Sequence, residues 1–104
     1  MNESRESQRL DWREVNSVVA LDLASKAFPN DDDLRTGKDY GVSFMEGNNT
    51  WMLSNGVLSY ALGTIEAVRD FKRDVEATSW NVDSEVIDEG RDFMAIQYSN
   101  GRGR

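Results

Sequence analysis

Twenty-three consecutive residues, 40–62, carry only one charged side chain, that of Glu46. Turn-forming residues at 47–49 and the Asn55-Gly56 pair divide this stretch into three short apolar runs, at 39–45, 50–54 and 57–62. The first run alternates between two sets of side chains, which is the periodicity of a β-strand. Asn55 and Gly56 both tolerate positive φ, so they favour a type I′ hairpin between the second and third runs. The stretch therefore predicts a three-stranded antiparallel meander.

An amphipathic helix is predicted before the meander. Asp11 and Glu14 have the spacing of a capping box, in which an acceptor at the N-cap precedes a glutamate by three residues. Apolar residues then recur at helical spacing as far as Ala27. Pro29 cannot continue a helix and disfavours helical geometry at the residue before it. We therefore expect a first helix from about Trp12 to Ala27.

A second helix and two further strands are predicted after the meander. Gly63 and Thr64 end the third run and cap an amphipathic segment at 65–80. Strand-like runs follow at 84–88 and 92–99, joined through Gly90, which would supply the left-handed residue of a hairpin loop. The order α-β-β-β-α-β-β indicates a two-layer α+β domain, with two helices on an antiparallel five-stranded sheet. We expect this domain to span 11–99, between a flexible N-terminus, 1–10, and a flexible C-terminal tail, 100–104.

Composition restricts the function more than any motif does. The chain has 19 acidic and 12 basic residues, a net charge of -7, and such a surface is repelled by phosphate backbones, so we expect no direct binding of nucleic acid. Histidine and cysteine are both absent, which removes the usual general base, the thiolate nucleophile and the commonest metal ligands. No phosphate-binding glycine loop or nucleophile motif occurs. We therefore expect a protein that is not an enzyme and holds no cofactor or metal.

The same sequence offers no membrane segment. No run approaches the roughly 18 apolar residues that span a bilayer, and the N-terminal residues lack the apolar core of a signal peptide. We expect a cytoplasmic protein, in the host cytoplasm if the source is viral.

Two acidic clusters are candidate binding surfaces. Asp31, Asp32 and Asp33 follow Pro29, and Asp88 and Glu89 lie in the predicted hairpin between the last two strands. The first cluster lacks the ligand spacing of a calcium loop, so the local interpretation is a solvated turn. A sharper hypothesis treats both clusters as one surface that imitates spaced phosphates and occupies the nucleic-acid site of another protein.

The uncharged meander suggests a second kind of contact. If one face of the sheet meets the helices, the other shows neutral and small apolar groups, which resembles the composition of a protein interface. Tyr40, Met45, Trp51 and Tyr60 are the candidate anchors for a partner. The alternative is that the helices cover both faces, so that the whole sheet is buried. A self-complementary patch would instead produce a homodimer.

These features predict a small acidic protein-binding module that is not catalytic. It would inhibit or neutralise a basic, nucleic-acid-handling protein, and in size, acidity and lack of catalytic residues it is similar to toxin-immunity proteins and phage-encoded inhibitors. The alternative is a dimeric adaptor that holds a partner segment against its helix-sheet surface. The α-β-β-β-α-β-β order and the acidity resemble those of small secretion chaperones, although no clear third helix follows Tyr98.

Overall fold

The computed structural model of the chain describes residues 9–100. Its elements, in chain order, are the 3₁₀ helix η2 (Trp12–Glu14), α1 (Ser17–Ala27), α2 (Asp32–Thr36), β1 (Gly41–Met45), β2 (Thr50–Ser54), β3 (Leu58–Gly63), α3 (Ile65–Ala77), β4 (Trp80–Asp88), the 3₁₀ helix η3 (Glu89–Arg91) and β5 (Phe93–Asn100). The strands form one antiparallel sheet in the order β1-β2-β3-β5-β4. The predicted α+β class, the five strands and the order of the long elements are therefore confirmed.

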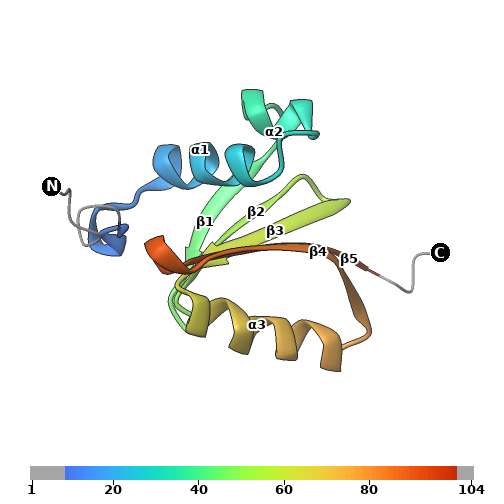
Figure 1. Cartoon of the computed structure of the whole chain (residues 1–104). Helices are drawn as coiled ribbons and strands as arrows, with labels where there is room; N and C mark the ends of the chain where they lie inside the picture. Colours follow the sequence, from blue (N-terminus) through green and yellow to red (C-terminus); the bar gives the residue numbers. More distant parts are fainter. Residues whose placement is uncertain (1–8, 101–104) are drawn as a thin grey trace, which may run out of the picture.

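The layers differ from the prediction, because helices cover both faces of the sheet. Figure 1 shows α1 and α2 on one side of the sheet and α3 on the other. The buried residues accordingly form two clusters, one beneath α1 that includes Leu53 and Tyr60, and one beneath α3 that includes Ala61 and Ile96. Both faces of the central strands are apolar, so both need a covering layer. The fold has three layers where the order of the elements predicted two, and the alternative in which helices cover both faces of the sheet is confirmed.

The first helix starts five residues later than predicted. Asp11 caps only the short helix η2, where its side chain accepts a hydrogen bond from the amide of Arg13. The α-helix starts at Ser17, since the side chain of Asn16 accepts from the amide of Val19 at 3.0 Å and caps the new helix. The expected capping box is thus the start of a separate turn.

The segment after Pro29 is a helix and not a solvated turn. Asp31 is the N-cap of α2, and its side chain accepts from the amide of Leu34 at 3.0 Å. Gly37 ends α2 in a left-handed conformation with φ of 76°. Leu34 is completely buried and joins the cluster beneath α1. One apolar residue among charged ones therefore docks this short helix onto the core.

Both predicted glycine turns differ in detail. Of the Asn55-Gly56 pair only Gly56 has positive φ, and the side chain of Asn55 accepts from the amides of Val57 and Leu58 at 2.9 Å, so the turn is not type I′. Between β4 and β5 the left-handed residue is Asp92, with φ of 52°, and not Gly90. Hydrogen bonds to the side chains of Asn55 and Asp88 stabilise these loops, where residues with positive φ were expected at Asn55 and Gly90.

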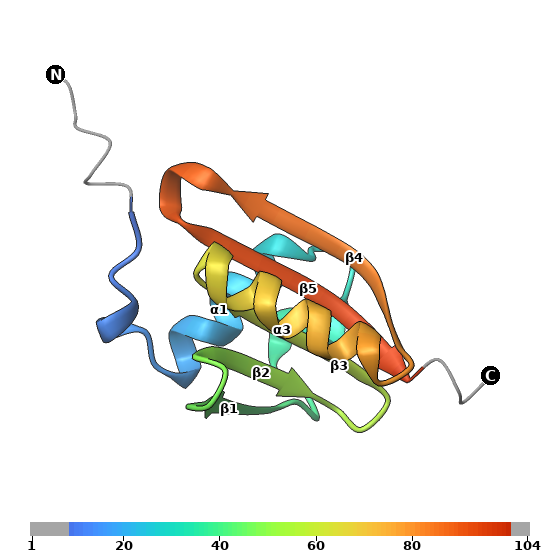
Figure 2. The same ribbon diagram turned by 90° about the horizontal axis from the view of Figure 1, so that it is seen from below.

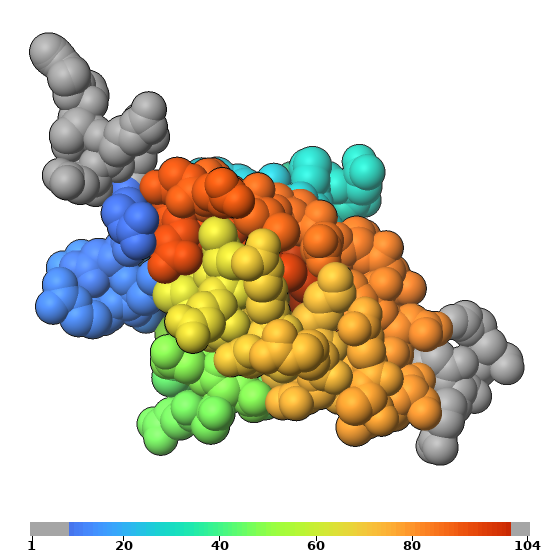
Figure 3. All heavy atoms as spheres, turned by 60° about the horizontal axis from the view of Figure 1, so that its bottom comes forward, coloured from blue at the N-terminus to red at the C-terminus, as the bar shows by residue number. Residues whose placement is uncertain are grey.

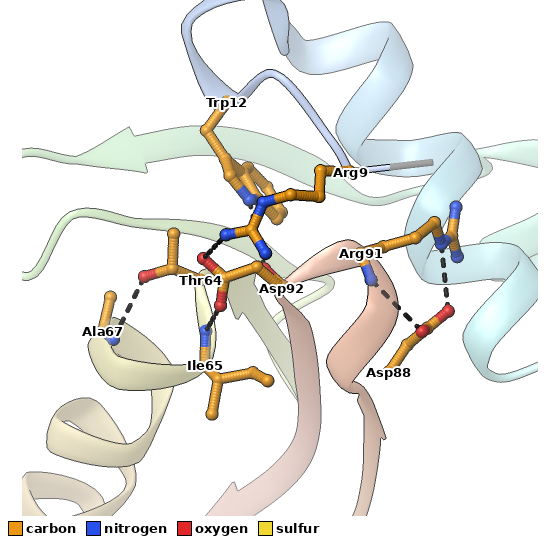
Figure 4. Close-up of polar contacts among 8 residues, drawn as sticks. All are labelled: Arg9, Trp12, Thr64, Ile65, Ala67, Asp88, Arg91 and Asp92. Carbon is orange, nitrogen blue, oxygen red and sulfur yellow. Dashed lines mark hydrogen bonds and ion pairs between the residues drawn. The ribbon is translucent and has the colours of Figure 1, made fainter. Parts of the chain in front are cut away.

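Asp92 also ties three distant parts of the chain together (Figure 4). Its side chain accepts from the amide of Ile65 at 3.2 Å, at the start of α3, and lies 3.6 Å from the guanidinium of Arg9. Its backbone carbonyl accepts from the indole nitrogen of Trp12 at 3.2 Å. These contacts fix the segment before α1 to the end of the sheet where α3 begins.

Candidate functional site

Two tyrosines from separate parts of the chain donate hydrogen bonds to one carboxylate, that of Asp31. The Asp31 Oδ2 atom accepts hydrogen bonds from the hydroxyl of Tyr40 at 2.9 Å and from that of Tyr60 at 2.7 Å. Tyr40 directly precedes β1, and Tyr60 lies near the middle of β3, the central strand of the sheet. The N-cap position of Asp31 turns its carboxylate back towards the sheet, while Oδ1 bonds the first turn of α2.

Aromatic rings surround this carboxylate. The Phe28 and Tyr60 ring centroids lie 4.9 Å apart, and those of Tyr40 and Tyr60 lie 5.9 Å apart. Gln97 on β5 donates from Nε2 to the Tyr60 hydroxyl at 3.0 Å, so this hydroxyl both donates and accepts. Tyr60 is completely buried, whereas Tyr40 is half-buried. The network therefore has a fixed interior and a side that solvent can reach.

The network keeps the carboxylate charged and the phenols neutral at pH 7. Burial opposes ionisation of Asp31, but the hydrogen bonds from Tyr60, the Leu34 amide and Tyr40 outweigh it, and the pKa of Asp31 is lowered. Burial and the hydrogen bond to Asp31 raise the pKa of Tyr60 to about 12. The same two causes, in the same order, raise the pKa of Tyr40. All three shifts move away from neutrality, which suits a binding site better than proton transfer.

A cavity of about 600 Å³ opens beside this network, and we call it the Asp31 pocket. Its wall includes Phe28, Tyr40 and Tyr60, and the exposed residues Asp32 and Asp33 lie on it as well. The other lining residues are Ala27, Pro29, Asn30, Asp31, Asn55, Leu58, Ser84 and Gln97. These lining residues, all within the described range 9–100, include three carboxylates and no lysine or arginine. Carboxylates and aromatic rings that line the same pocket form an environment that favours an organic cation.

The structure brings together five of the nine residues predicted to bind a partner and places the other four elsewhere. The five are Asp31, Asp32, Asp33, Tyr40 and Tyr60, all of which line the Asp31 pocket. The remaining four line no part of it. Met45 packs against the cluster beneath α3, and half-buried Trp51 packs against Phe44 with ring centroids 5.3 Å apart. Asp88 pairs with Arg91 at 3.0 Å in the β4–β5 connection, where Glu89 is exposed.

Sequence reasoning missed two members of this site, Phe28 and Gln97. Gln97 shares a sheet face with Phe93 and Ala95, because side chains two residues apart on a strand point the same way. A polar residue in an otherwise apolar alternating series was a signal that something polar lies opposite it. Phe28 gave no such signal, since it appeared only as the residue at which the first helix stops.

Much of the uncharged meander is explained by burial. Ser59 and Ala61 face α3, and both are buried. Figure 3 views the molecule from this side, with the residues of α3 across the middle of the face. On β1, by contrast, Gly41, Ser43 and Phe44 are exposed. Of the neutral surface predicted for the meander, the first strand and the turn residue Val57 are thus the parts that stay exposed.

Comparison with known proteins found no similar protein: no protein-family model matches the chain, and no curated protein and no solved structure matches it. Within residues 9–100, no three acidic side chains come together in a way that could hold a metal ion. None of the helices described is long and apolar enough to cross a membrane. A function for this chain is therefore inferred from the chemistry of the pocket and of the surface.

Proposed function

We propose that this chain is a small acidic protein-binding module, and that an arginine or lysine side chain of a basic partner enters the Asp31 pocket. The observation that supports this most directly is the pocket itself, in which aromatic rings surround a carboxylate held in its ionised form. Exposed Asp33 adds a negative charge at the wall, where an entering cation would meet it, and exposed Asp32, which pairs with Arg35 at 3.4 Å, lies beside it.

The charge of the whole chain supports the same kind of partner. A net charge of -7 accelerates encounter with a basic protein and repels nucleic acid, which is itself acidic. Basic surfaces are characteristic of proteins that handle nucleic acids, since they must neutralise phosphates. We therefore propose that the module inhibits such a protein by covering its basic surface.

The direct test measures binding of a labelled tetra-arginine peptide by fluorescence anisotropy, beside a peptide in which citrulline replaces every arginine. Citrulline has nearly the shape of arginine without its charge, so only the arginine peptide should bind. Binding should weaken as salt rises. Equal binding of the two peptides, or binding that is independent of salt, would contradict the proposal.

Two matched double variants separate the contribution of the pocket to peptide binding from the contribution of net negative charge. Asp32→Asn with Asp33→Asn removes two charges at the Asp31 pocket, and Asp70→Asn with Glu76→Gln removes two exposed charges on α3. The first pair should weaken arginine-peptide binding by roughly tenfold, and the second by much less. Equal losses in both would show that net charge alone attracts the peptide, which would remove the pocket from the proposal.

One observation favours the adaptor as a second candidate function. An apolar groove of about 350 Å³ runs beside α3, with Met52, Phe71, Val75, Trp80 and Tyr98 among its lining residues. An adaptor would hold an apolar partner segment there. A photo-crosslinking amino acid at Asn48, on the groove, or at Asp33, on the Asp31 pocket, distinguishes the two functions. The partner should cross-link from position 33 if the first is correct and from position 48 if the second is.

A further inference from the structure

The outer strand β1 lacks the features that normally protect the edge of a sheet. Strand β1 pairs only with β2, so its other side presents unpaired backbone donors and acceptors. Its five residues include no charged residue and no proline. Proteins usually place such residues, or a bulge, on an edge strand to prevent pairing with another chain.

The opposite edge shows that protection. Figure 2 shows β4 at the other side of the sheet from β1. Strand β4 contains Asp83, Glu85 and Asp88, and its register with β5 shifts between Val82 and Ser84, as a bulge produces. The same sheet therefore has one edge closed to further pairing and one edge open to it.

Exposed apolar side chains accompany the open edge. Within residues 9–100, five large hydrophobic side chains are exposed, and three of them belong to α1 and β1, which contact each other. These three are Val18, Val19 and Phe44, with exposed fractions of 75%, 36% and 42%. An additional strand at β1 would cover part of this apolar surface, which adds a hydrophobic contribution to the backbone hydrogen bonds.

We propose that the occupant of this edge is a second copy of the chain, so that two β1 strands pair antiparallel and form a ten-stranded sheet. A two-fold axis through Ser43 makes the strand complementary to itself. Ser43 then lies opposite the partner's Ser43, and Val42 lies opposite the partner's Phe44. Gly41, with no side chain, lies opposite the partner's Met45. Small groups thus face large ones, and no charge faces a like charge.

The turns that flank β1 lie outside this register. Lys38 and Glu46 are exposed in these turns, and Asp39, between Lys38 and the strand, has a positive φ of 65°, so the alternation of the strand does not extend to them. The size complementarity of the five strand residues is supplied by each copy to the other, and this favours a second copy over an unrelated peptide.

The experiment measures sedimentation over a range of protein concentrations. The wild-type chain, of 11.8 kDa, should sediment as a species of twice that mass. Ser43→Lys places two ammonium groups directly opposite each other and should raise the dimer dissociation constant by roughly tenfold or more. Asn81→Lys, at an exposed position on the protected strand β4, makes the same change of charge and should leave the dimer intact.

A cysteine variant tests the register and does not depend on the folding of the lysine variant. The chain has no cysteine, so Ser43→Cys can form only an intermolecular disulfide, and under mild oxidation it should produce a covalent dimer with the circular dichroism of the wild type. Asn81→Cys is the control that should not cross-link. A wild-type chain that sediments as a monomer throughout overturns the proposal. A dimer that resists Ser43→Lys and fails to cross-link through Ser43→Cys also overturns it.

Discussion

The hydroxyl of Tyr60 donates to the Oδ2 atom of Asp31 at 2.7 Å, across 29 positions of the sequence. This contact joins the central strand to the N-cap of α2, so one carboxylate orients a short helix and lines a pocket at the same time. A helix of five residues is too short to be stable by itself. Its position therefore depends on Asp31 and on buried Leu34.

Asp31→Asn should lower the free energy of unfolding by about 1–2 kcal/mol, because the amide offers one acceptor where the carboxylate offers two charged ones. Urea unfolding measures the change. The pKa of Asp31 is lowered on folding, so its contribution is present above the ordinary carboxyl pKa and is lost as pH falls through the folded value. The difference between wild type and variant should therefore shrink in acid. Asp33→Asn, at an exposed neighbour, should change stability by less than about 0.5 kcal/mol, and equal effects of the two would contradict this account.

Alkaline pH should destabilise the protein through its tyrosines. All three tyrosines of the chain, Tyr40, Tyr60 and Tyr98, have a raised pKa, and burial raises those of Tyr60 and Tyr98 to about 12. In the unfolded chain these phenols ionise near pH 10. A group with a raised folded pKa contributes stability that is fully present below its unfolded pKa and is lost as pH rises through the folded one. Stability should thus fall between about pH 10 and pH 12.

Two measurements check this prediction. An absorbance titration of the folded protein at the phenolate band should show no tyrosine that ionises near pH 10. Tyr98→Phe, which leaves the Asp31 pocket intact, should make the fall in unfolding free energy less steep by up to about 1.4 kcal/mol per pH unit. A phenol of the folded chain that titrates at its ordinary pKa would show that burial does not act as described.

Local signals predicted most of the strands better than the helix ends, except that β4 starts at Trp80, four residues before its predicted start. Strand β2 has the predicted bounds, because residues that favour turns flank its apolar run on both sides. The start of α1 was wrong because Asp11 and Asn16 are both good N-caps, and spacing alone could not show that the chain uses each for a different helix. For α2, the N-cap Asp31 and the terminal Gly37 were both visible in the sequence, but five residues are too few for periodicity to appear.

The site depends on contacts that periodicity cannot supply. Asp31 was named as part of an acidic cluster, and Tyr40 and Tyr60 were named as anchors on the uncharged meander, but nothing in the sequence indicated that the three touch. Their meeting requires α2 to lie over the α1 face of the sheet, and short apolar strands do not reveal which helix covers which face. Val42 and Tyr60 lie on one face of the sheet and Ala61 on the other, as the alternation of side chains along β1 and β3 implies.

Replacement of Asp92 should reveal how much its side-chain acceptor and its left-handed backbone each contribute to the free energy of unfolding. The residue is left-handed, and its carboxylate accepts from the Ile65 amide at the start of α3 (Figure 4). Asp92→Ala removes the acceptor and strains the backbone, and should cost about 1–2 kcal/mol. Asp92→Gly removes the acceptor but tolerates the left-handed backbone, so it should cost less stability. Asp92→Asn keeps a side-chain oxygen acceptor and also tolerates the left-handed backbone, so it should cost least. Urea unfolding of the three variants gives this order, and an alanine variant as stable as the asparagine variant would contradict it.

Thr50 is completely buried, and within residues 9–100 its hydroxyl has no hydrogen-bond partner. A buried hydroxyl without a partner costs about 1–3 kcal/mol of desolvation, and valine has almost the shape of threonine without that group. Thr50→Val should therefore raise the free energy of unfolding by about 1 kcal/mol, measured by urea unfolding at pH 7. Thr50→Ser keeps the hydroxyl but loses a methyl group, so it should lower stability by about 1 kcal/mol. A valine variant less stable than wild type would mean that the hydroxyl is satisfied in solution, and the serine variant would then report only the cost of the lost methyl group.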